Sequence, residues 1–460
     1  MNVGLVVDHP KRDLPGIVLT AYELARRGVQ AYIIPLYEQA TDVPLLALDA
    51  LIVNFARPAN FALVEGYAAM EIPVFVLDSE GGVLTGNGAN APHMLAAYMK
   101  ESGFSQLLVG YLFWGSRLRE AFVAGSGMAA EKLHVTGCPR FDFCSPKWRD
   151  TLRYPREGYV LVNANFSLVN PLFTRSPEKE RDTLVAAGWR PEYVEKMLSD
   201  MRRILQGFLA DVVRLTWHHP QQQFLIRPHP FEKPEIYKRA FADCVNAVVD
   251  GSGNVLNAIH RATCVLHINC GTAIEAVMLG KLPVSLEYLN SEMMARHGPL
   301  PSQISYQAVS YDELSEVVER TAKLTRSFDF SGCYSRYIYP WFHHMDGGAA
   351  TRIAEVVLST ISGRPRGVPS ISSSLAASRK NSSRIQRAQA ILNNLLGSLA
   401  VSRLRSATQP VRKEKRITLS AVSEQIRLLA CHEGRPVPRV RHARHPISGF
   451  PLSSITVSYS

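Results

Sequence analysis

The alternation of short apolar runs with amphipathic segments is the feature of this sequence that most restricts its fold. In the first part of the chain, each apolar run ends in polar residues and is followed by a segment of helical periodicity. Strands separated by helices pair in parallel, and a parallel sheet needs helices on both faces. The first set of strands is expected at 2–8, 31–35, 50–54, 74–78, 107–112 and 132–135.

This rhythm stops at a turn-rich stretch, 136–142, and restarts after a charged connector at 147–157. A second set of strands is expected at 159–162, 223–226, 247–250, 264–268 and 283–286. The pattern predicts an α/β protein with two Rossmann-like, doubly wound domains facing across a cleft. We expect an N-terminal domain at 1–146 and a C-terminal, ligand-binding domain at 147–362.

The last part of the chain differs in charge from the rest. A chain of 460 residues is too long for one core. Residues 363–460 hold 17 Lys and Arg against 3 Glu, whereas residues 1–362 hold 34 Lys and Arg against 37 Asp and Glu, so the net charge of +11 comes entirely from the end. We expect residues 363–460 to be a basic, mostly disordered tail with one short helix at 385–405, or an unselected, frameshifted end.

Composition also limits which cellular compartment and which binding partners can be expected for this protein. Seven cysteines without a CxxC pair predict neither a disulfide framework nor a zinc site. The N-terminus lacks a signal-peptide pattern, and no stretch is apolar enough for a membrane span, so a cytoplasmic protein is expected. The tail lacks the interleaved aromatic residues of a nucleic-acid platform. It could rest against anionic lipid at the inner membrane face, although a solvated tail without function is the simpler interpretation.

Polar clusters follow two strands of the second domain. Arg227, Pro228, His229 and Pro230 come directly after one apolar run. The stretch 269–272 (Asn-Cys-Gly-Thr) comes after another and opens a helix. Because ligands bind at the carboxyl ends of parallel strands, we expect both clusters at a site for a phosphorylated ligand.

His229 is the strongest candidate within this stretch. The flanking prolines restrict its backbone, so its ring can be held ready to donate a hydrogen bond to a phosphate as the leaving nucleotide gains charge. Arg227 adds a fixed cation. The alternative is a histidine that only satisfies a carbonyl at the end of a strand.

The turn at Gly271 and Thr272 is expected to present backbone N–H groups and a hydroxyl to the same ligand. Glu275 could accept a hydrogen bond from a ribose hydroxyl, or could simply be a favourable charge at a helix N-terminus. Asn269 is expected to support the turn beside the ligand. Asn163 and Asn165, at the end of another strand, could bind sugar or pyrophosphate, or only stabilise their loop.

The reacting group should come from the first domain. Asp13 and Glu80 both follow strands of its sheet, and Glu80 lies next to Gly81 and Gly82, which would let a substrate approach closely. Either carboxylate could deprotonate an acceptor or face a developing oxocarbenium ion, or could instead be a helix or turn cap. Asp8 and His9 form an alternative pair at the same rim. No metal-binding spacing of Asp or His is present, so transfer without a metal or other cofactor is expected.

Several stretches together resemble the bacterial surface-carbohydrate biosynthesis proteins, which are relatives of the GT-B-type glycosyltransferases. Arg227 to Pro230 also resembles the His-Pro motif of capsule Kdo transferases, polysialyltransferases and CDP-glycerol glycerophosphotransferases, in which it lies near the donor phosphate. The sequence departs from the family at Cys138, where Asn is usual, and near Ala164. The matching stretches are 11–13, 78–82, 114–115, 136–142, 162–170, 227–230, 269–276 and 346–353.

The resemblance implies a GT-B glycosyltransferase that uses a nucleotide sugar, of the UDP or CMP type, to build surface polysaccharide or lipopolysaccharide. The domain at 147–362 would bind the nucleotide sugar, and the domain at 1–146 would face the acceptor, a glycan or a lipid-linked precursor. Three alternatives remain open at this stage. They are a nucleotide-sugar 2-epimerase-like enzyme, a CDP-glycerol-type glycerophosphotransferase, and a non-catalytic scaffold in polysaccharide assembly.

Overall fold

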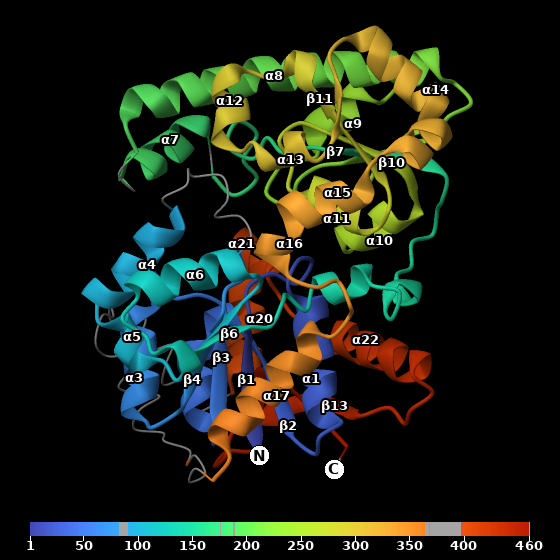
Figure 1. Cartoon of the computed structure of the whole chain (residues 1–460). Coiled ribbons are helices and arrows are strands. Elements are labelled where there is room, and N and C mark those ends of the chain that lie inside the picture. Colours follow the sequence, from blue (N-terminus) through green and yellow to red (C-terminus); the bar gives the residue numbers. More distant parts are fainter. Residues whose placement is uncertain (82–90, 175, 187–188, 364–367, 369–396, 460) are drawn as a thin grey trace. The chain divides into compact units, whose positions relative to one another are not determined.

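The computed structural model describes residues 1–81, 91–174, 176–186, 189–363, 368 and 397–459 (Figure 1). The chain divides into two compact units. Of the described residues, unit 1 holds those up to Thr151 together with those from Pro340 onward, and unit 2 holds those between Leu152 and Tyr339. Gly82 and the first part of the predicted helix, 385–396, lie outside the described residues.

Unit 1 is built on an eight-stranded sheet with the order β13-β14-β2-β1-β3-β4-β5-β6. From β2 to β6 the strands are parallel. The chain first places β2 on one side of β1 and then adds β3 to β6 on the other. The winding therefore reverses between β1 and β3, and such a reversal opens a crevice at the carboxyl ends of the two strands. The parallel strands are β1 (Asn2–Val7), β2 (Gln30–Pro35), β3 (Ala50–Val53), β4 (Val74–Leu77), β5 (Gly110–Phe113) and β6 (Leu133–Val135).

Helices between these strands cover the sheet. α1 (Leu14–Ala25) is buried along almost its whole length. It packs against α17 (Ala349–Ile361), which returns from the far end of the chain. Asp142 holds the start of α17, because its carboxylate accepts hydrogen bonds from the backbone N–H groups of Ala349 and Ala350, both at 2.9 Å. The predicted second domain, which extended to residue 362, was therefore too long, since α17 buries its apolar face in unit 1. The other main helices are α3 (Phe61–Ala69), α4 (Ala91–Glu101) and α6 (Ser116–Gly125).

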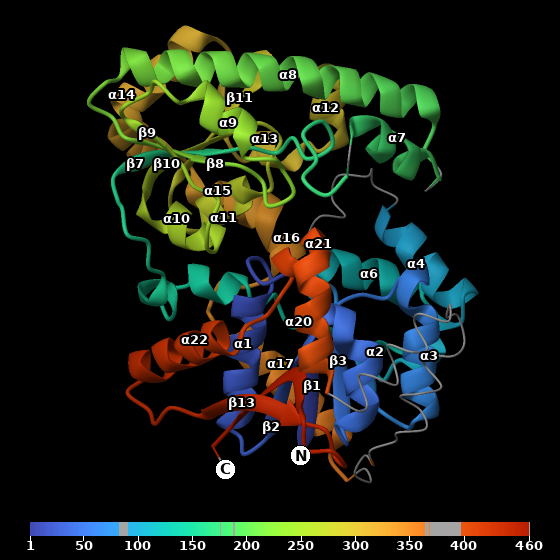
Figure 2. The ribbon, with the colours of Figure 1, turned by 180° about the vertical axis from the view of Figure 1, so that it is seen from behind.

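The prediction of a disordered tail is wrong for residues 397–459, which form three helices and two strands. β14 (Pro451–Ser458) pairs antiparallel with β2, and β13 (Arg439–Arg444) pairs with β14. α20 (Ser398–Thr408) and α21 (Pro410–Glu414) lead into α22 (Leu419–His432), which packs on α1 (Figure 2). Apolar side chains rather than charge decide this packing: Val422, Ile426, Leu429, Leu452, Ile455 and Val457 are all fully buried.

Unit 2 is a six-stranded parallel sheet with the order β12-β11-β10-β7-β8-β9. Counted from β7, the first strand, this is the 3-2-1-4-5-6 order of the Rossmann fold, and the winding reverses between β7 and β10. The strands are β7 (Tyr159–Asn163), β8 (Phe224–Arg227), β9 (Ala247–Val249), β10 (Ala262–His267), β11 (Leu282–Leu286) and β12 (Tyr306–Ala308). Two doubly wound α/β units confirm the predicted fold class.

The helices of unit 2 follow from its apolar pattern. The long helix α8 (Pro191–His218) turns one face to the sheet, where Met197, Ile204, Phe208 and Leu215 join a continuous core. α9 (Glu235–Ala240), α10 (Val255–Arg261), α11 (Thr272–Met278), α12 (Glu292–His297) and α14 (Tyr311–Ser327) connect the remaining strands. Among the described residues, no helix combines the length and the apolar character that crossing a bilayer requires.

Candidate functional site

The switch point of unit 2 gathers polar side chains from the ends of β7 and β10. The Asn163 Nδ2 donates to the Thr272 Oγ1 at 2.8 Å, and the Asn165 Nδ2 donates to the carbonyl oxygen of Asn269 at 2.9 Å. Asn163 is only 3% exposed, and its Oδ1 has no hydrogen-bond partner within the described part of the chain. A buried amide oxygen without a partner is costly, so this acceptor is suited to a ligand hydroxyl or a bound water.

Asn269 shapes the loop after β10. Its φ of 46° lies in the left-handed region, which Asn tolerates better than most residues. Its Nδ2 donates to the Asn290 Oδ1 at 2.9 Å, which ties the loop after β10 to the loop after β11. The predicted supporting role agrees with these bonds, and direct contact with a ligand stays a prediction.

The start of α11 offers fewer open donors than its sequence suggests. α11 has seven residues, and the N–H groups of Ala273 and Ile274 donate to the carbonyls of Cys270 and Gly271 in tight turns. The Thr272 hydroxyl accepts from Asn163, so its own hydrogen can be donated, either to Cys270 Sγ at 3.1 Å or to a ligand. A side chain at position 271 would meet no atom within 4 Å, so the surface there is open.

Glu275 is 3% exposed in α11. A ribose contact for Glu275 therefore requires a ligand that reaches below the surface, and it stays a prediction.

His229 follows β8, on the opposite side of β7 from β10. β7, which ends at Asn163, therefore lies between the two strands that precede the polar clusters. The backbone N–H of Phe231 donates to the His229 Nδ1 at 3.2 Å. A ring nitrogen that accepts a hydrogen bond is unprotonated, so in the neutral ring the Nε2 carries the proton and is a donor.

Arg227 is a clamp in this structure. Its guanidinium, in a residue that is 6% exposed, donates to the carbonyl oxygens of Ser252 and Gly253 at 2.6 and 2.5 Å. Burial lowers the pKa of Arg227 from its ordinary value, an effect that Tyr154 and Asp250 oppose. These bonds hold the loop after β9 against the end of β8, and the predicted phosphate contact stays a prediction.

Glu232 connects the loops that carry Asn163 and His229, and sequence reasoning missed it. One carboxylate oxygen accepts the backbone N–H of Phe166 at 2.6 Å, and the other accepts the hydroxyl of Tyr237. Its own backbone N–H donates to the carbonyl of His229 at 2.9 Å. Glu232 is 2% exposed, and this burial raises the pKa of its carboxyl. The only sequence feature that could have indicated this role is a Glu two residues beyond the His-Pro pair.

The switch point of unit 1 brings the two predicted carboxylates to one cation. The guanidinium of Arg12 lies 2.9 Å from Asp13, 3.0 Å from Asp8 and 3.6 Å from Glu80. The side chain of Asp13 is 11% exposed and burial raises its pKa, whereas 59% of the Glu80 side chain is exposed. Glu80 is thus the more accessible of the two for a reaction with a substrate.

Other groups hold this cluster in place. The Asp78 carboxylate forms an ion pair with Arg57 at 2.7 Å. It also accepts hydrogen bonds from the Tyr111 hydroxyl at 3.2 Å and from the backbone N–H of Glu80 at 2.9 Å. The last of these bonds orders the turn that carries Glu80. A small cavity of about 30 Å³ lies beside it, and Asn54, at the end of β3, lines this cavity. Asn54 is 5% exposed, and neither polar atom of its side chain has a partner among the described residues.

His9 repeats the local geometry of His229. Both precede a proline, and in both the backbone N–H two residues further on donates to Nδ1 at 3.2 Å. Burial and then the nearby Arg12 lower the pKa of His9 to about 4, so its ring is neutral at pH 7.

The last element of the unit 1 cluster comes from the other end of the chain. The Lys415 Nζ lies 2.6 Å from the Asp8 Oδ1, and each of these side chains is 15% exposed. Lys415 directly follows α21, within the segment expected to be a solvated tail. Sequence reasoning could not find this pair, because nothing in either sequence neighbourhood points to the other.

No protein-family model matches this chain, and the search of curated proteins found no significant match. Solved structures show the fold. A putative UDP-N-acetylglucosamine 2-epimerase from Listeria monocytogenes aligns over 80% of this chain and 99% of its own, with 13% identity and a TM-score of 0.50. A variant of the wall teichoic acid polymerase TagF aligns over 78% of this chain and 89% of its own, with 11% identity and a TM-score of 0.50. The chain therefore has a GT-B-like fold of two Rossmann-like domains.

Proposed function

We propose that this protein is a GT-B-type glycosyltransferase that transfers a sugar from a nucleotide-sugar donor to a precursor of a surface polysaccharide or lipopolysaccharide. The observation that carries this proposal is the buried Oδ1 of Asn163, which has no hydrogen-bond partner among the residues that the structure describes, at the switch point of unit 2 next to the bonded Thr272 hydroxyl. A Rossmann-like sheet binds its ligand at that point, and the sequence around His229 resembles a motif that lies near donor phosphates.

In this proposal the donor lies along the carboxyl ends of β8, β7 and β10. The His229 Nε2–H and the Thr272 hydroxyl donate to phosphate oxygens, and the Asn163 Oδ1 accepts a hydroxyl of the donor. Donors fixed in advance stabilise the charge that develops on a leaving UDP or CMP without having to reorganise during the reaction. Glu275 is proposed to bind the ribose, and Gly271, Asn269 and Asn165 to shape the surface beneath the donor.

Glu80 is the proposed base for the acceptor hydroxyl. Asp13 is held by Arg12 and by the backbone N–H of His9 at 3.1 Å, so we assign it to positioning this arginine. A base should be accessible to the acceptor hydroxyl, and exposure favours Glu80. The proposed partners are a nucleotide sugar and a glycan or lipid-linked acceptor, at the cytoplasmic face of the inner membrane. The basic segment 397–459 could contact anionic lipid there.

Nucleotide binding tests the donor site. UDP, CMP, CDP and GDP are added separately, and the rise in melting temperature reports which one binds, because a ligand of the folded state stabilises it by mass action. His229→Ala should lose a hydrogen bond to a charged group, about 1.5–3 kcal/mol, and so weaken the Kd of the bound nucleotide by about 10- to 150-fold. His93→Ala, an exposed histidine on α4, is the matched control. Equal affinities for the two variants would contradict the donor site.

Product analysis then identifies the reaction. The nucleotide sugar of the preferred class is incubated with and without membranes from a polysaccharide-producing bacterium. Sugar transfer that requires the acceptor and is lost in Glu80→Gln supports the proposal. Conversion of the donor by itself would indicate an epimerase, and release of CMP from CDP-glycerol would indicate a glycerophosphotransferase.

A further inference from the structure

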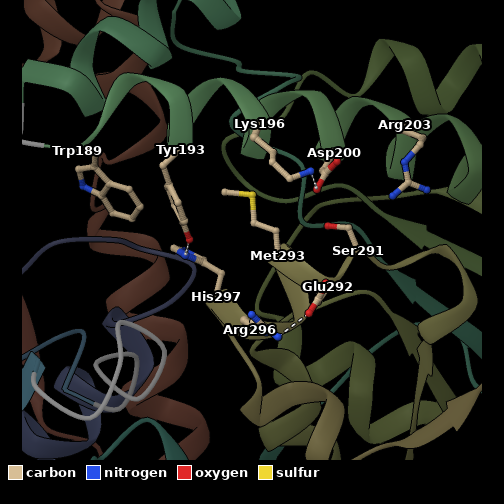
Figure 3. A pocket seen from close by; sticks show the side chains of 10 residues that line it. All are labelled: Trp189, Tyr193, Lys196, Asp200, Arg203, Ser291, Glu292, Met293, Arg296 and His297. Atoms are coloured by element: carbon tan, nitrogen blue, oxygen red, sulfur yellow. Dashed lines mark hydrogen bonds and ion pairs between the residues drawn. The ribbon is translucent and has the colours of Figure 1, made fainter.

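A groove of about 810 Å³ runs along α8 in unit 2, apart from the core-facing side of that helix (Figure 3). Its upper wall in the figure is formed by Trp189, Tyr193, Lys196, Asp200 and Arg203. Trp189 lies just before the start of α8, and the other four are three and four residues apart, so they form a stripe on one face of the helix. At 1.5 Å per residue these four span about 15 Å. The opposite wall comes mainly from α12, with Ser291, Glu292, Met293, Arg296 and His297.

One end of the groove is an aromatic wall. The ring centroids of Trp189, Tyr193 and His297 lie 5.6–6.2 Å apart, and the three planes are tilted against one another by 43–48°. The Tyr193 hydroxyl and the His297 Nδ1 are 2.9 Å apart, which holds two of the rings in place. Burial lowers the pKa of His297 from its ordinary value, so this ring is neutral at pH 7.

The other end of the groove is charged, with more cations than carboxylates. Lys196 lies 3.5 Å from Asp200, and Arg296 lies 2.5 Å from Glu292. Arg203, on the same stripe, has no ion-pair partner within the described ranges. The pairs offer donors and acceptors side by side, and the unpaired guanidinium leaves a net positive charge for an acidic group.

The groove lies at the ligand edge of the sheet. α8 connects β7 to β8 and so runs antiparallel to them, which places its N-terminal half at their carboxyl ends. α12 begins just beyond the carboxyl end of β11. The Asn290 side chain joins the two regions, because its Oδ1 accepts the backbone N–H of Ser291 at 3.0 Å and the Asn269 Nδ2 at 2.9 Å.

We propose that this groove binds an acidic oligosaccharide. We assign this oligosaccharide as the acceptor of the transferase, and that assignment rests on the function proposed above. The apolar faces of sugar rings pack on exposed aromatic rings. Sugar hydroxyls both donate and accept hydrogen bonds, so they can bind both the cation and the carboxylate of each ion pair in the groove. A flat nucleobase would fit better between parallel rings, and these three are tilted. A wall of about 15 Å along α8, with Trp189 beyond its start, also suits several linked sugars better than one nucleoside.

Labelled octasaccharides of hyaluronan, alginate and polysialic acid, with neutral maltooctaose as reference, test the inference by fluorescence anisotropy on the full chain. At least one acidic octasaccharide should bind more tightly than maltooctaose. Trp189→Ala should weaken its binding at least tenfold, whereas Trp217→Ala, which removes a 64%-exposed tryptophan further along α8, should not. Arg203→Ala should reduce the preference for acidic chains, and the exposed neighbour Arg202 provides the control variant Arg202→Ala. Melting temperatures of all four variants report whether each is folded.

The outcomes separate the two proposals. Binding of an acidic octasaccharide that depends on Trp189 but comes without any nucleotide binding would leave the groove standing and remove the transferase function. Nucleotide binding without binding of any acidic octasaccharide would overturn the groove. Equal losses in Trp189→Ala and Trp217→Ala, or direct competition of UMP or CMP with the octasaccharide, would also overturn it.

Discussion

Glu232 should control both the stability of unit 2 and the order of its proposed donor site. Replacing it with Ala removes two hydrogen bonds to a carboxylate, from the Phe166 N–H and from the Tyr237 hydroxyl, and leaves both donors buried. Hydrogen bonds to a charged group contribute about 1.5–3 kcal/mol each. From the sum we deduct the cost of burying the carboxylate, which the raised pKa of Glu232 reports. We expect Glu232→Ala to lower the free energy of unfolding by about 3 kcal/mol.

Thermal unfolding measures this loss. In a domain of this size, 1 kcal/mol shifts the melting temperature by about 2–4 °C, so a decrease of about 6–12 °C is expected. Tyr237→Phe removes only one of the two hydrogen bonds and should lose about 1–2 kcal/mol. Glu232→Gln keeps an acceptor for the Phe166 N–H and should fall between the wild type and Glu232→Ala.

The same variants link stability to the site. Because Glu232 joins the loop after β7 to the His-Pro turn after β8, Glu232→Gln should weaken the Kd of the bound nucleotide several-fold at a temperature where the variant is fully folded. Hydrogen exchange at the Phe166 amide should accelerate in parallel. If Glu232→Ala lost less than about 1 kcal/mol, or if the Phe166 amide stayed as protected as in the wild type, the assigned link between the loops would be refuted.

Three further predictions concern charge and burial. Burial lowers the pKa of His267 to about 3, below its ordinary value. As the pH falls below about 6.5, the His267 ring binds a proton in the unfolded chain before it does so in the folded protein, and the free energy of unfolding decreases. The loss should reach about 2 kcal/mol at pH 5 in urea unfolding, and His267→Gln should remove that dependence. Lys415→Met should leave Asp8 paired with Arg12 alone and cost about 1 kcal/mol in thermal unfolding, whereas Lys413→Met on the exposed side of α21 should change stability by less than about 0.5 kcal/mol. Asp142→Ala should cost about 3 kcal/mol in the same assay, because two backbone N–H groups at the start of α17 lose their acceptor, and Asp142→Asn about half of that.

Much of the fold could be predicted because burial on both sides leaves a direct mark on the sequence. Strands of a parallel sheet are apolar on both faces, so β8 and β10 appear as short apolar runs whose ends identify the ligand edge. The strand expected at 107–112 lies instead at Gly110–Phe113, after the short helix α5 (Phe104–Leu107), because an apolar run does not distinguish a helix from a strand.

The segment 397–459 shows where charge misleads. Its Lys and Arg residues suggested a solvated tail, but Ile455 and Val457 of β14 pair with residues of β2, more than four hundred residues earlier. Ser454 donates through both its backbone N–H and its hydroxyl to the buried Asp42, at 2.9 and 2.6 Å. A strand that completes the edge of a sheet cannot be recognised from its own sequence when the edge it covers is so distant.

The sequence by itself determined that the chain forms two doubly wound units, and it marked His229, Thr272, Asn163, Asp13 and Glu80 at strand ends, because local periodicity and turn residues act over only a few positions. Tertiary structure alone decided that Arg227 clamps a loop, that Glu232 joins two loops, and that Lys415 reaches Asp8. It also decided that one face of α8, which by composition resembles a solvated surface, becomes a wall of a groove. Each of these depends on which distant segment packs against a side chain, and that is set by the burial of the whole core.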